Sequence, residues 1–242
     1  MLRIFIIQKL INFFDYFQQK KIFDLLKKKL GKEIIIFDVG AHHGETIKKF
    51  IKNFDLEKIH SFEASSKNFK KLVKNTKNCQ FKNIVLNNVG LSDENKEFLI
   101  NQLSESSSTT LSAINEKSKY FLRKINVLGL SKNEDYYQKL KVKLETLDSY
   151  IEKNNIQKIN LLKIDTEGHE LYVLRGCKNN ISKIHFIYFE HHYDDMLDKG
   201  YTFSEMSKFL GENSFKKIYK SKMFFRKTFE YIYENTKLNN EL

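Results

Sequence analysis

Side chains able to carry acid, base or ligand chemistry stand in four short clusters of this 242-residue chain, each directly after an apolar run. The clusters are Asp38 to Gly44, Glu63, Asp165 to His169, and Glu190 to His192. Carboxylates and imidazoles accept protons, hold metal ions and bind the hydroxyl groups of ligands. Each cluster alone is a weak signal. Together they predict one crevice, because the carboxyl ends of parallel strands lie on one edge of a sheet, where ligands of open α/β sheets bind.

The first cluster belongs to the stretch IIIFDVGAHHGETIKK, which begins at Ile34. An uninterrupted apolar run, a loop with Gly40 and Gly44, and then a helical pattern are typical of the first βα unit of a doubly wound α/β domain. Glycine lets a ligand approach the backbone closely. We therefore expect Asp38 and this loop to hold a nucleotide-like cofactor.

Glu63 supports the same interpretation. It follows a short expected strand over residues 58–62, about 20 residues after the glycine loop, where such sheets place the carboxylate that binds ribose hydroxyls. Without the glycine loop, a solvated strand-end residue would be the better interpretation. Ser92 and Asp93 follow a third expected strand over 84–89 and could approach a bound adenine, although an ordinary turn explains them equally well.

The hydrophobic pattern predicts one domain over residues 32–234, with a helical extension over 1–31 and a polar tail over 235–242. Residues 104–141 begin with the hydroxyl-rich SESSSTTLS and carry only weak helical signals, so we expect a lid or substrate loop there. We expect further helices over 46–54, 65–77, 170–176 and 201–210, and we expect Gly211 to end the last of them. Further strands are expected over 96–101, 158–164, 183–189, 215–220 and 222–233. Residues 142–155 should form a strand followed by a short helix.

The formal net charge of +12 would ordinarily suggest a polyanionic partner. Only four of the 42 basic residues are arginine, however, and the chain has no proline, which points to an AT-rich genome that favours lysine codons. Arginine is the more specialised phosphate-binding residue, so we do not expect a nucleic-acid partner. Cys79 and Cys177 lie far apart and indicate neither a zinc site nor a disulfide framework, which fits a reducing cytoplasm.

The N-terminal stretch is rich in Phe and Ile, but Arg3, Lys9 and Asp15 interrupt it before about 20 apolar residues accumulate. We expect no membrane span and no secretory cleavage site. A helix packed on the domain is the preferred interpretation of residues 1–30. An amphipathic helix in peripheral contact with a membrane is the alternative that this stretch leaves open.

Five segments carry a resemblance to a known family: IFDVGAHHGET, SFEASSKNFKKL, NVGLSD, VKLETLDSYI and NLLKIDTEGHELYVLRGC, the last followed by FIYFE. They closely resemble the FkbM family of S-adenosylmethionine-dependent methyltransferases over about residues 33–192. KIDTEGHE is the most specific of these motifs. The family commonly has Asn where this chain has His42, so we expect a backbone contact at this position rather than the usual side-chain hydrogen bond.

The resemblance implies a class I methyltransferase fold: an α/β, doubly wound, mostly parallel sheet of seven strands, with strand 7 antiparallel and helices on both faces. It implies that Asp38, Gly40 and Gly44 cradle the methionine part of S-adenosylmethionine and that Glu63 holds the ribose. The chemistry agrees, because this cofactor has one carboxylate and no phosphates and needs only a close-approach loop at a helix N-terminus. A dinucleotide would more often require GxGxxG than the GxxxG found here.

The expected reaction is O-methylation of a hydroxyl on a sugar, glycan precursor or other small metabolite. Such a transfer requires an aligned acceptor and a group that takes its proton. Asp165 and His169 are the candidates for that base or for orienting the acceptor, since imidazole titrates near neutrality; helix capping is the alternative role of Asp165. Asp165, Glu190 and His191 could instead bind a divalent metal ion, which is not strongly indicated.

Two rival functions remain open from the sequence. An RNA-directed methyltransferase would account for the charge, although no RNA-binding module is recognisable. A non-catalytic cofactor-fold protein that binds a membrane or an assembly would be expected to lose Asp38 or Glu63, and both are present. The identity of the acceptor and the oligomeric state are not predicted.

Overall fold

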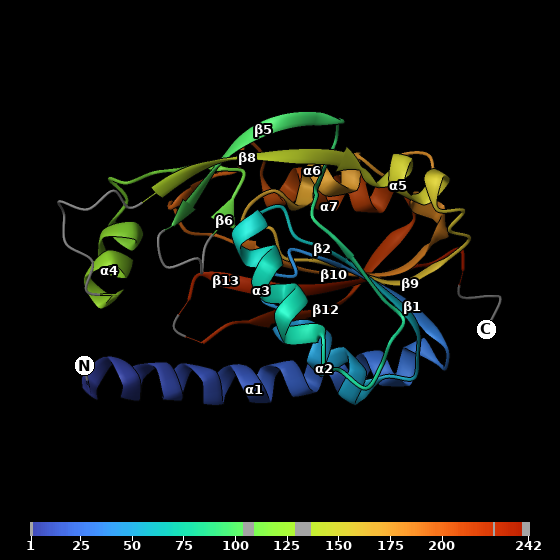
Figure 1. Cartoon of the computed structure of the whole chain (residues 1–242), viewed down its shortest axis with the longest axis horizontal. Coiled ribbons are helices and arrows are strands. Elements are labelled where there is room, and N and C mark those ends of the chain that lie inside the picture. Colours follow the sequence, from blue (N-terminus) through green and yellow to red (C-terminus); the bar gives the residue numbers. More distant parts are fainter. Residues whose placement is uncertain (1, 104–108, 129–136, 225, 239–242) are drawn as a thin grey trace.

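A seven-stranded sheet forms the centre of the molecule, with helices on both faces (Figure 1). The computed structural model describes residues 2–103, 109–128, 137–224 and 226–238. The strand order is β12-β13-β10-β9-β1-β2-β3. The strands are β1 (Ile34–Val39), β2 (Leu56–Phe62), β3 (Ile84–Asn87), β9 (Ile159–Ile164), β10 (Ile184–His192), β12 (Phe215–Lys222) and β13 (Thr228–Asn235). β13 alone runs antiparallel to the other six strands, which confirms the expected class I arrangement within the described residues.

The central strands end level with one another. β1 pairs with β9 so that Asp38 lies opposite Lys163 and Val39 opposite Ile164. The next residue after β9, Asp165, donates its backbone N–H to the Val39 carbonyl at 3.0 Å. All six residues of β9 are buried, as expected for a strand covered on both faces. The loops that follow β1 and β9 therefore leave the sheet side by side.

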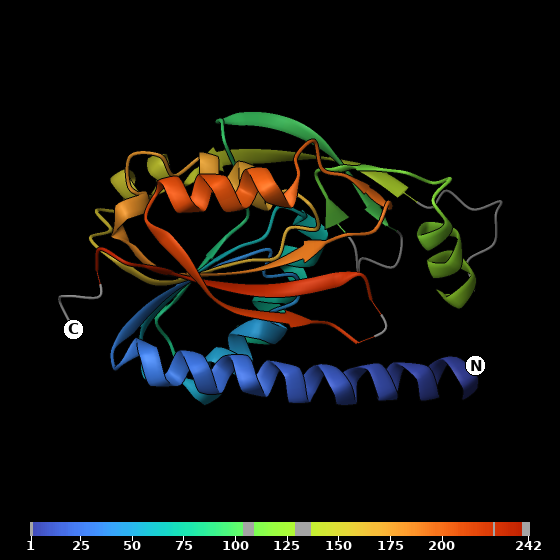
Figure 2. The same ribbon diagram turned by 180° about the vertical axis from the view of Figure 1, so that it is seen from behind.

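In the described part of the chain, six helices cover the sheet, three on each face, and Figure 2 shows the two layers. One layer holds α1 (Leu2–Leu30), α2 (Glu45–Asn53) and α3 (Ser66–Thr76), and the other holds α5 (Leu147–Lys153), α6 (Glu170–Arg175) and α7 (Phe203–Glu212), with a short 3-10 turn η1 (Ile181–Lys183) before β10. The expected stop of the last helix at Gly211 is wrong. The helix continues to Glu212 and is capped by Asn213, because nothing near Gly211 forces it to end and its backbone does not adopt positive φ.

Helix α1 packs on the sheet through its second half. Ile22 and Leu26 are fully buried against the inner residues of α2 and of the sheet. Polar contacts fix the same half: Gln18 Nε2 donates to Glu230 Oε2 at 2.6 Å, and Lys29 Nζ lies 2.9 Å from Glu234 Oε1. The packed-helix interpretation is confirmed for this half. No helix among the described residues is long and apolar enough to cross a membrane.

A second sheet, in the order β4-β8-β5-β6, lies on the side of the central sheet that α5, α6 and α7 cover (Figure 1). Its strands are β4 (Gly90–Ser92), β5 (Lys96–Leu103), β6 (Thr109–Thr110) and β8 (Tyr137–Thr146), and β7 (Ala113–Ile114) pairs separately with β11 (Leu197–Asp198). Residues 137–141, expected to be irregular, are the first half of β8, because β5 supplies an antiparallel partner for residues 137–144. The interval 104–141 also contains α4 (Lys119–Leu128). Its segments 104–108 and 129–136 lie outside the described residues.

Candidate active site

A cavity of about 260 Å³ opens at the carboxyl ends of β1, β2 and β9. Its wall combines residues from the four segments that follow these strands and β3. Gly40 and His42 come from the loop after β1, Glu63 from the loop after β2, Leu91 from β4, which follows β3, and Asp165 from the loop after β9. The structure therefore brings residues of three of the four predicted clusters around one cavity.

Glu63 is fixed by the backbone of two loops. Its Oε2 accepts the N–H of His42 and its Oε1 accepts the N–H of Ser65, each at 2.9 Å. Only 5% of the residue is exposed, and burial raises the pKa of its carboxyl group while these two hydrogen bonds oppose the rise. Each carboxylate oxygen can accept a further hydrogen bond. Two neighbouring hydroxyl groups of a ligand are the partners that such a pair of oxygens suits.

The two loop glycines have different surroundings. Gly40 has φ +79°, and a Cβ atom there would lie 1.9 Å from the carbonyl oxygen of Asp165, so this position must be glycine for the loops after β1 and β9 to touch. Gly44 has φ +87° and faces Leu72 of α3, 2.9 Å from where its Cβ would be. Gly44 lies outside the cavity wall. It shapes the start of α2 and the packing of α3, and any effect on a ligand would be indirect.

A buried ion group lies at the floor of the cavity, and two of its members, Lys163 and Asp165, line the wall. Lys163 Nζ lies 3.2 Å from Asp38 Oδ1 and 3.4 Å from Asp165 Oδ2. Burial would lower the pKa of Lys163, but the carboxylates of Asp38 and Asp165 together raise it above its usual value, so the ammonium is charged. Asp38 is fully buried, and burial raises its pKa against the influence of Lys163. Asp38 is therefore an inner support of the cavity, while Asp165, with its side chain 33% exposed, reaches the wall.

Sequence reasoning missed Lys163, which was part of an expected apolar core strand. A signal was available: the stretch INLLKI places one lysine in an otherwise apolar run. Lysine is almost never fully buried unless it is paired. A cation inside a core strand therefore predicts a carboxylate on a neighbouring strand.

The turn between β9 and α6 is tied to Glu170. Its Oε1 accepts the N–H of Gly168 at 2.9 Å, and its Oε2 accepts the hydroxyl of Tyr201 at 2.5 Å. Glu167 and Gly168 both have positive φ, so the chain turns sharply before the helix starts. This turn sends Thr166 and Glu167 to the cavity wall and carries the next residues away from it.

His169 lies on the far side of that turn. Its Nε2 is 2.9 Å from Ser92 Oγ, and its ring stacks on Tyr172 with centroids 4.6 Å apart. Burial lowers the pKa of His169 to about 4. Ser92 also donates a hydrogen bond to Asp93 Oδ1 at 3.0 Å. His169, Ser92 and Asp93 thus form a group of their own outside the cavity wall, and this placement does not favour His169 as a base.

The match to known families now decides the identity of the domain. Residues 38–217 match the methyltransferase FkbM domain. The chain belongs to the FkbM methyltransferase family. The similarity to a curated relative is more local: 45 residues are 40% identical to the hexuronic acid methyltransferase AglP of Haloferax volcanii, which is 19% of this chain and 19% of that protein.

Solved structures show that the fold is that of class I methyltransferases. A methyltransferase FkbM from Methylobacillus flagellatus KT matches with a TM-score of 0.53 and 14% identity over 84% of this chain and 43% of that one. A putative methyltransferase from Streptococcus mutans, in complex with SAH, matches with a TM-score of 0.52 and 12% identity over 89% and 96%. An rRNA methylase from Streptococcus thermophilus matches with a TM-score of 0.51 and 11% identity over 89% and 94%.

The last predicted cluster of this FkbM methyltransferase lies within β10, which continues to His192 instead of ending at residue 189. Glu190 and His191 are adjacent on this strand and so point to opposite faces of the sheet. His191 packs against the rings of Tyr201 and Phe203, and burial lowers its pKa to about 4. Burial, followed by the charges of Asp165 and Glu230, raises the pKa of Glu190 well above its usual value.

The geometry bears on the metal alternative. Since Glu190 and His191 point apart, these two side chains and Asp165 do not converge on one ion. Within the described part of the chain, the group with metal-ligating atoms close enough together is His42, His43 and Glu45, at the start of α2. Glu45 Oε2 lies 3.6 Å from His42 Nδ1, and Glu45 Oε1 lies 3.7 Å from His43 Nδ1.

Proposed function

We propose that this FkbM methyltransferase uses S-adenosylmethionine to methylate a hydroxyl group on a sugar, a glycan precursor or a related small metabolite. One observation carries the proposal. Glu63 and Asp165 line one cavity, beside the close contact between Gly40 and the Asp165 backbone. The first suits the ribose of the cofactor, and the second stands where an acceptor would meet it.

The residues around the cavity fit the cofactor. Glu63 offers two oxygens, each already positioned by a backbone N–H, to the two ribose hydroxyls. Leu91 and Ala64 supply apolar wall beside it for the adenine ring. The glycine loop before α2 places backbone N–H groups at a helix N-terminus, which suits the single carboxylate of the methionine part. When bound, S-adenosylmethionine supplies a methyl group on positively charged sulfur.

Asp165 is the base that we propose. The Asp165 carboxylate would accept the proton of the acceptor hydroxyl group as that hydroxyl takes the methyl group that the cofactor supplies. Lys163, 3.4 Å from Oδ2, holds this carboxylate in orientation. Thr166 and Glu167 line the wall beside it and could contact the rest of the acceptor. For His169 we propose a positioning role, in which its contact with Ser92 holds β4 against the turn before α6.

A carbohydrate acceptor is favoured by the local similarity to a hexuronic acid methyltransferase. That similarity covers a fifth of each protein, so it supports the class of acceptor and does not identify the sugar.

Calorimetric titration with S-adenosylhomocysteine tests the cofactor, and methyl transfer from labelled S-adenosylmethionine to a panel of hexuronic acids, neutral sugars and transfer RNA tests the acceptor. We expect binding heat and label in the carbohydrate fraction. A folded protein that shows no heat at high concentration would refute the cofactor proposal. Label in RNA alone would refute the acceptor proposal and leave the cofactor proposal standing.

A further inference from the structure

The positive charge of the chain is concentrated in one helical layer. Helix α1 has seven basic and two acidic residues, α2 has three lysines and one glutamate, and α3 has four lysines and no acidic residue. These three helices account for nearly all of the formal net charge of +12. A genome-wide preference for lysine codons would distribute lysine over every element, and it would not account for a layer with 14 basic and only three acidic residues. The lysine bias alone therefore does not explain the pattern.

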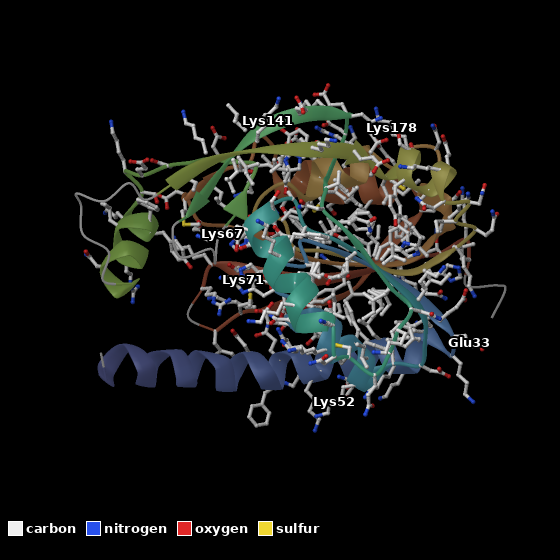
Figure 3. The ribbon with its side chains drawn as sticks, viewed as in Figure 1. Glu33, Lys52, Lys67, Lys71, Lys141 and Lys178 are labelled. Carbon is white, nitrogen blue, oxygen red and sulfur yellow. The ribbon has the colours of Figure 1, made fainter. Side chains whose placement is uncertain are left out.

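The lysines lie on the outer side of this layer. The inner sides of α1, α2 and α3 share one buried cluster with the sheet, which includes Leu26, Phe50 and Leu72. The outer sides carry exposed lysines, and Figure 3 labels Lys52, Lys67 and Lys71 among them. We call this set the lysine face: Lys20, Lys21, Lys27 and Lys28 of α1, Lys48 and Lys52 of α2, and Lys67, Lys70, Lys71 and Lys74 of α3. Among the described residues, no acidic side chain lies within 4.0 Å of these ammonium groups.

Helix α1 adds an apolar segment to the same layer. Residues 2–14, LRIFIIQKLINFF, have nine apolar and two basic residues and no acidic one. Ile6, Leu10 and Phe13 stand at helical spacing with Phe17, whose side chain is 49% exposed, and Phe17 is one turn before Lys21. The helix carries this segment along the edge of the molecule past β12 and β13 (Figure 2).

We propose that the lysine face and the first half of α1 together dock the protein on an anionic phospholipid membrane. A helix that combines basic and large apolar residues lies in the interface of such membranes, where each nearby lysine adds electrostatic attraction. Lysine suits this partner because it acts as a mobile point charge and needs no fixed geometry. A nucleic acid would not use the apolar segment, and specific phosphate binding would favour arginine, of which these helices have only Arg3. The inference does not depend on the proposed reaction.

Vesicle sedimentation with the full chain tests the proposal. We expect binding to vesicles that contain phosphatidylglycerol, no binding to pure phosphatidylcholine, and weaker binding as salt is raised. Two variants that each remove four positive charges give the decisive comparison. The test variant changes Lys67, Lys70, Lys71 and Lys74 to Gln, and the control changes the exposed Lys153, Lys158, Lys178 and Lys216 to Gln.

The test variant should bind anionic vesicles about tenfold or more weakly, and the control should stay close to wild type. Phe17→Ser should also weaken binding, which separates an apolar contribution from charge alone. Equal losses in the two lysine variants would show an effect of net charge only and would overturn the proposal. So would absence of binding to anionic vesicles, or RNA binding by the wild type that the test variant loses while vesicle binding is unchanged.

Discussion

Removing the charge of Lys163 should destabilise the fold strongly. Lys163→Met keeps the length of the side chain in β9 but leaves Asp38, which is fully buried 3.2 Å away, without its cation. Breaking a buried ion pair by removing one partner costs about 3–5 kcal/mol. The second contact, to the partly exposed Asp165, should add only about 0–1 kcal/mol, because water screens it. We expect a total loss in unfolding free energy of about 3–6 kcal/mol.

A double-mutant cycle shows whether the ion pair is the cause. Asp38→Asn alone leaves the buried ammonium with one partner fewer and should also destabilise the protein. In the double variant both charges are gone, so its loss should be smaller than the sum of the single losses by about 1–3 kcal/mol. Urea unfolding followed by circular dichroism near neutral pH measures all four proteins. Lys158→Met, an exposed lysine just before the same strand, is the control and should stay within about 0.5 kcal/mol of wild type. Additive single losses would refute the reasoning.

Three further predictions concern the cavity and its surroundings. Glu63→Gln should weaken binding of S-adenosylhomocysteine by about 1–3 kcal/mol in calorimetry, since it loses a charge-assisted acceptor; an unchanged affinity would remove Glu63 from the site. Asp165→Asn should abolish methyl transfer and leave that affinity nearly intact, whereas retained turnover would exclude Asp165 as the base. His191 has a folded-state pKa of about 4 and an ordinary value of 6.5, so the unfolded chain takes up its proton first as pH falls. The stability that His191 contributes is present above about pH 6.5 and is lost as pH falls towards about 4. His191→Phe should therefore lose less unfolding free energy than wild type between these pH values, as measured by urea unfolding. Parallel curves of unfolding free energy against pH for the two proteins would contradict the low folded-state pKa of His191.

The sequence predicted the middle of the sheet well because strands such as β1 and β9 are buried on both faces and so are marked by apolar runs, as in Ile34–Phe37. It predicted less of the smaller sheet. The first half of β8 depends on its partner β5, and a pairing between distant segments leaves no periodic mark in either one. The same limit applies to the last cluster, where β13 extends β10 as far as His192.

For the site, position along the chain was a good guide only where the backbone runs straight out of a strand. Glu63 and Asp165 directly follow β2 and β9, and both reach the cavity wall. His169 lies only four residues beyond Asp165, but the positive φ angles of Glu167 and Gly168 reverse the chain between them. Side-chain direction after such a turn is set by tertiary contacts, here those of Glu170 with Gly168 and Tyr201.

Gly40 has a consequence for how the domain can vary. The contact with the Asp165 carbonyl leaves room only for the hydrogen atom that is the side chain of glycine, since a Cβ atom would lie 1.9 Å from that oxygen. The separation between the loop that we propose for the cofactor and the loop that we propose for the acceptor is therefore set by a contact of backbone against backbone. Side chains around the cavity can change to suit another acceptor without altering this separation, whereas any substitution at position 40 should force the two loops apart.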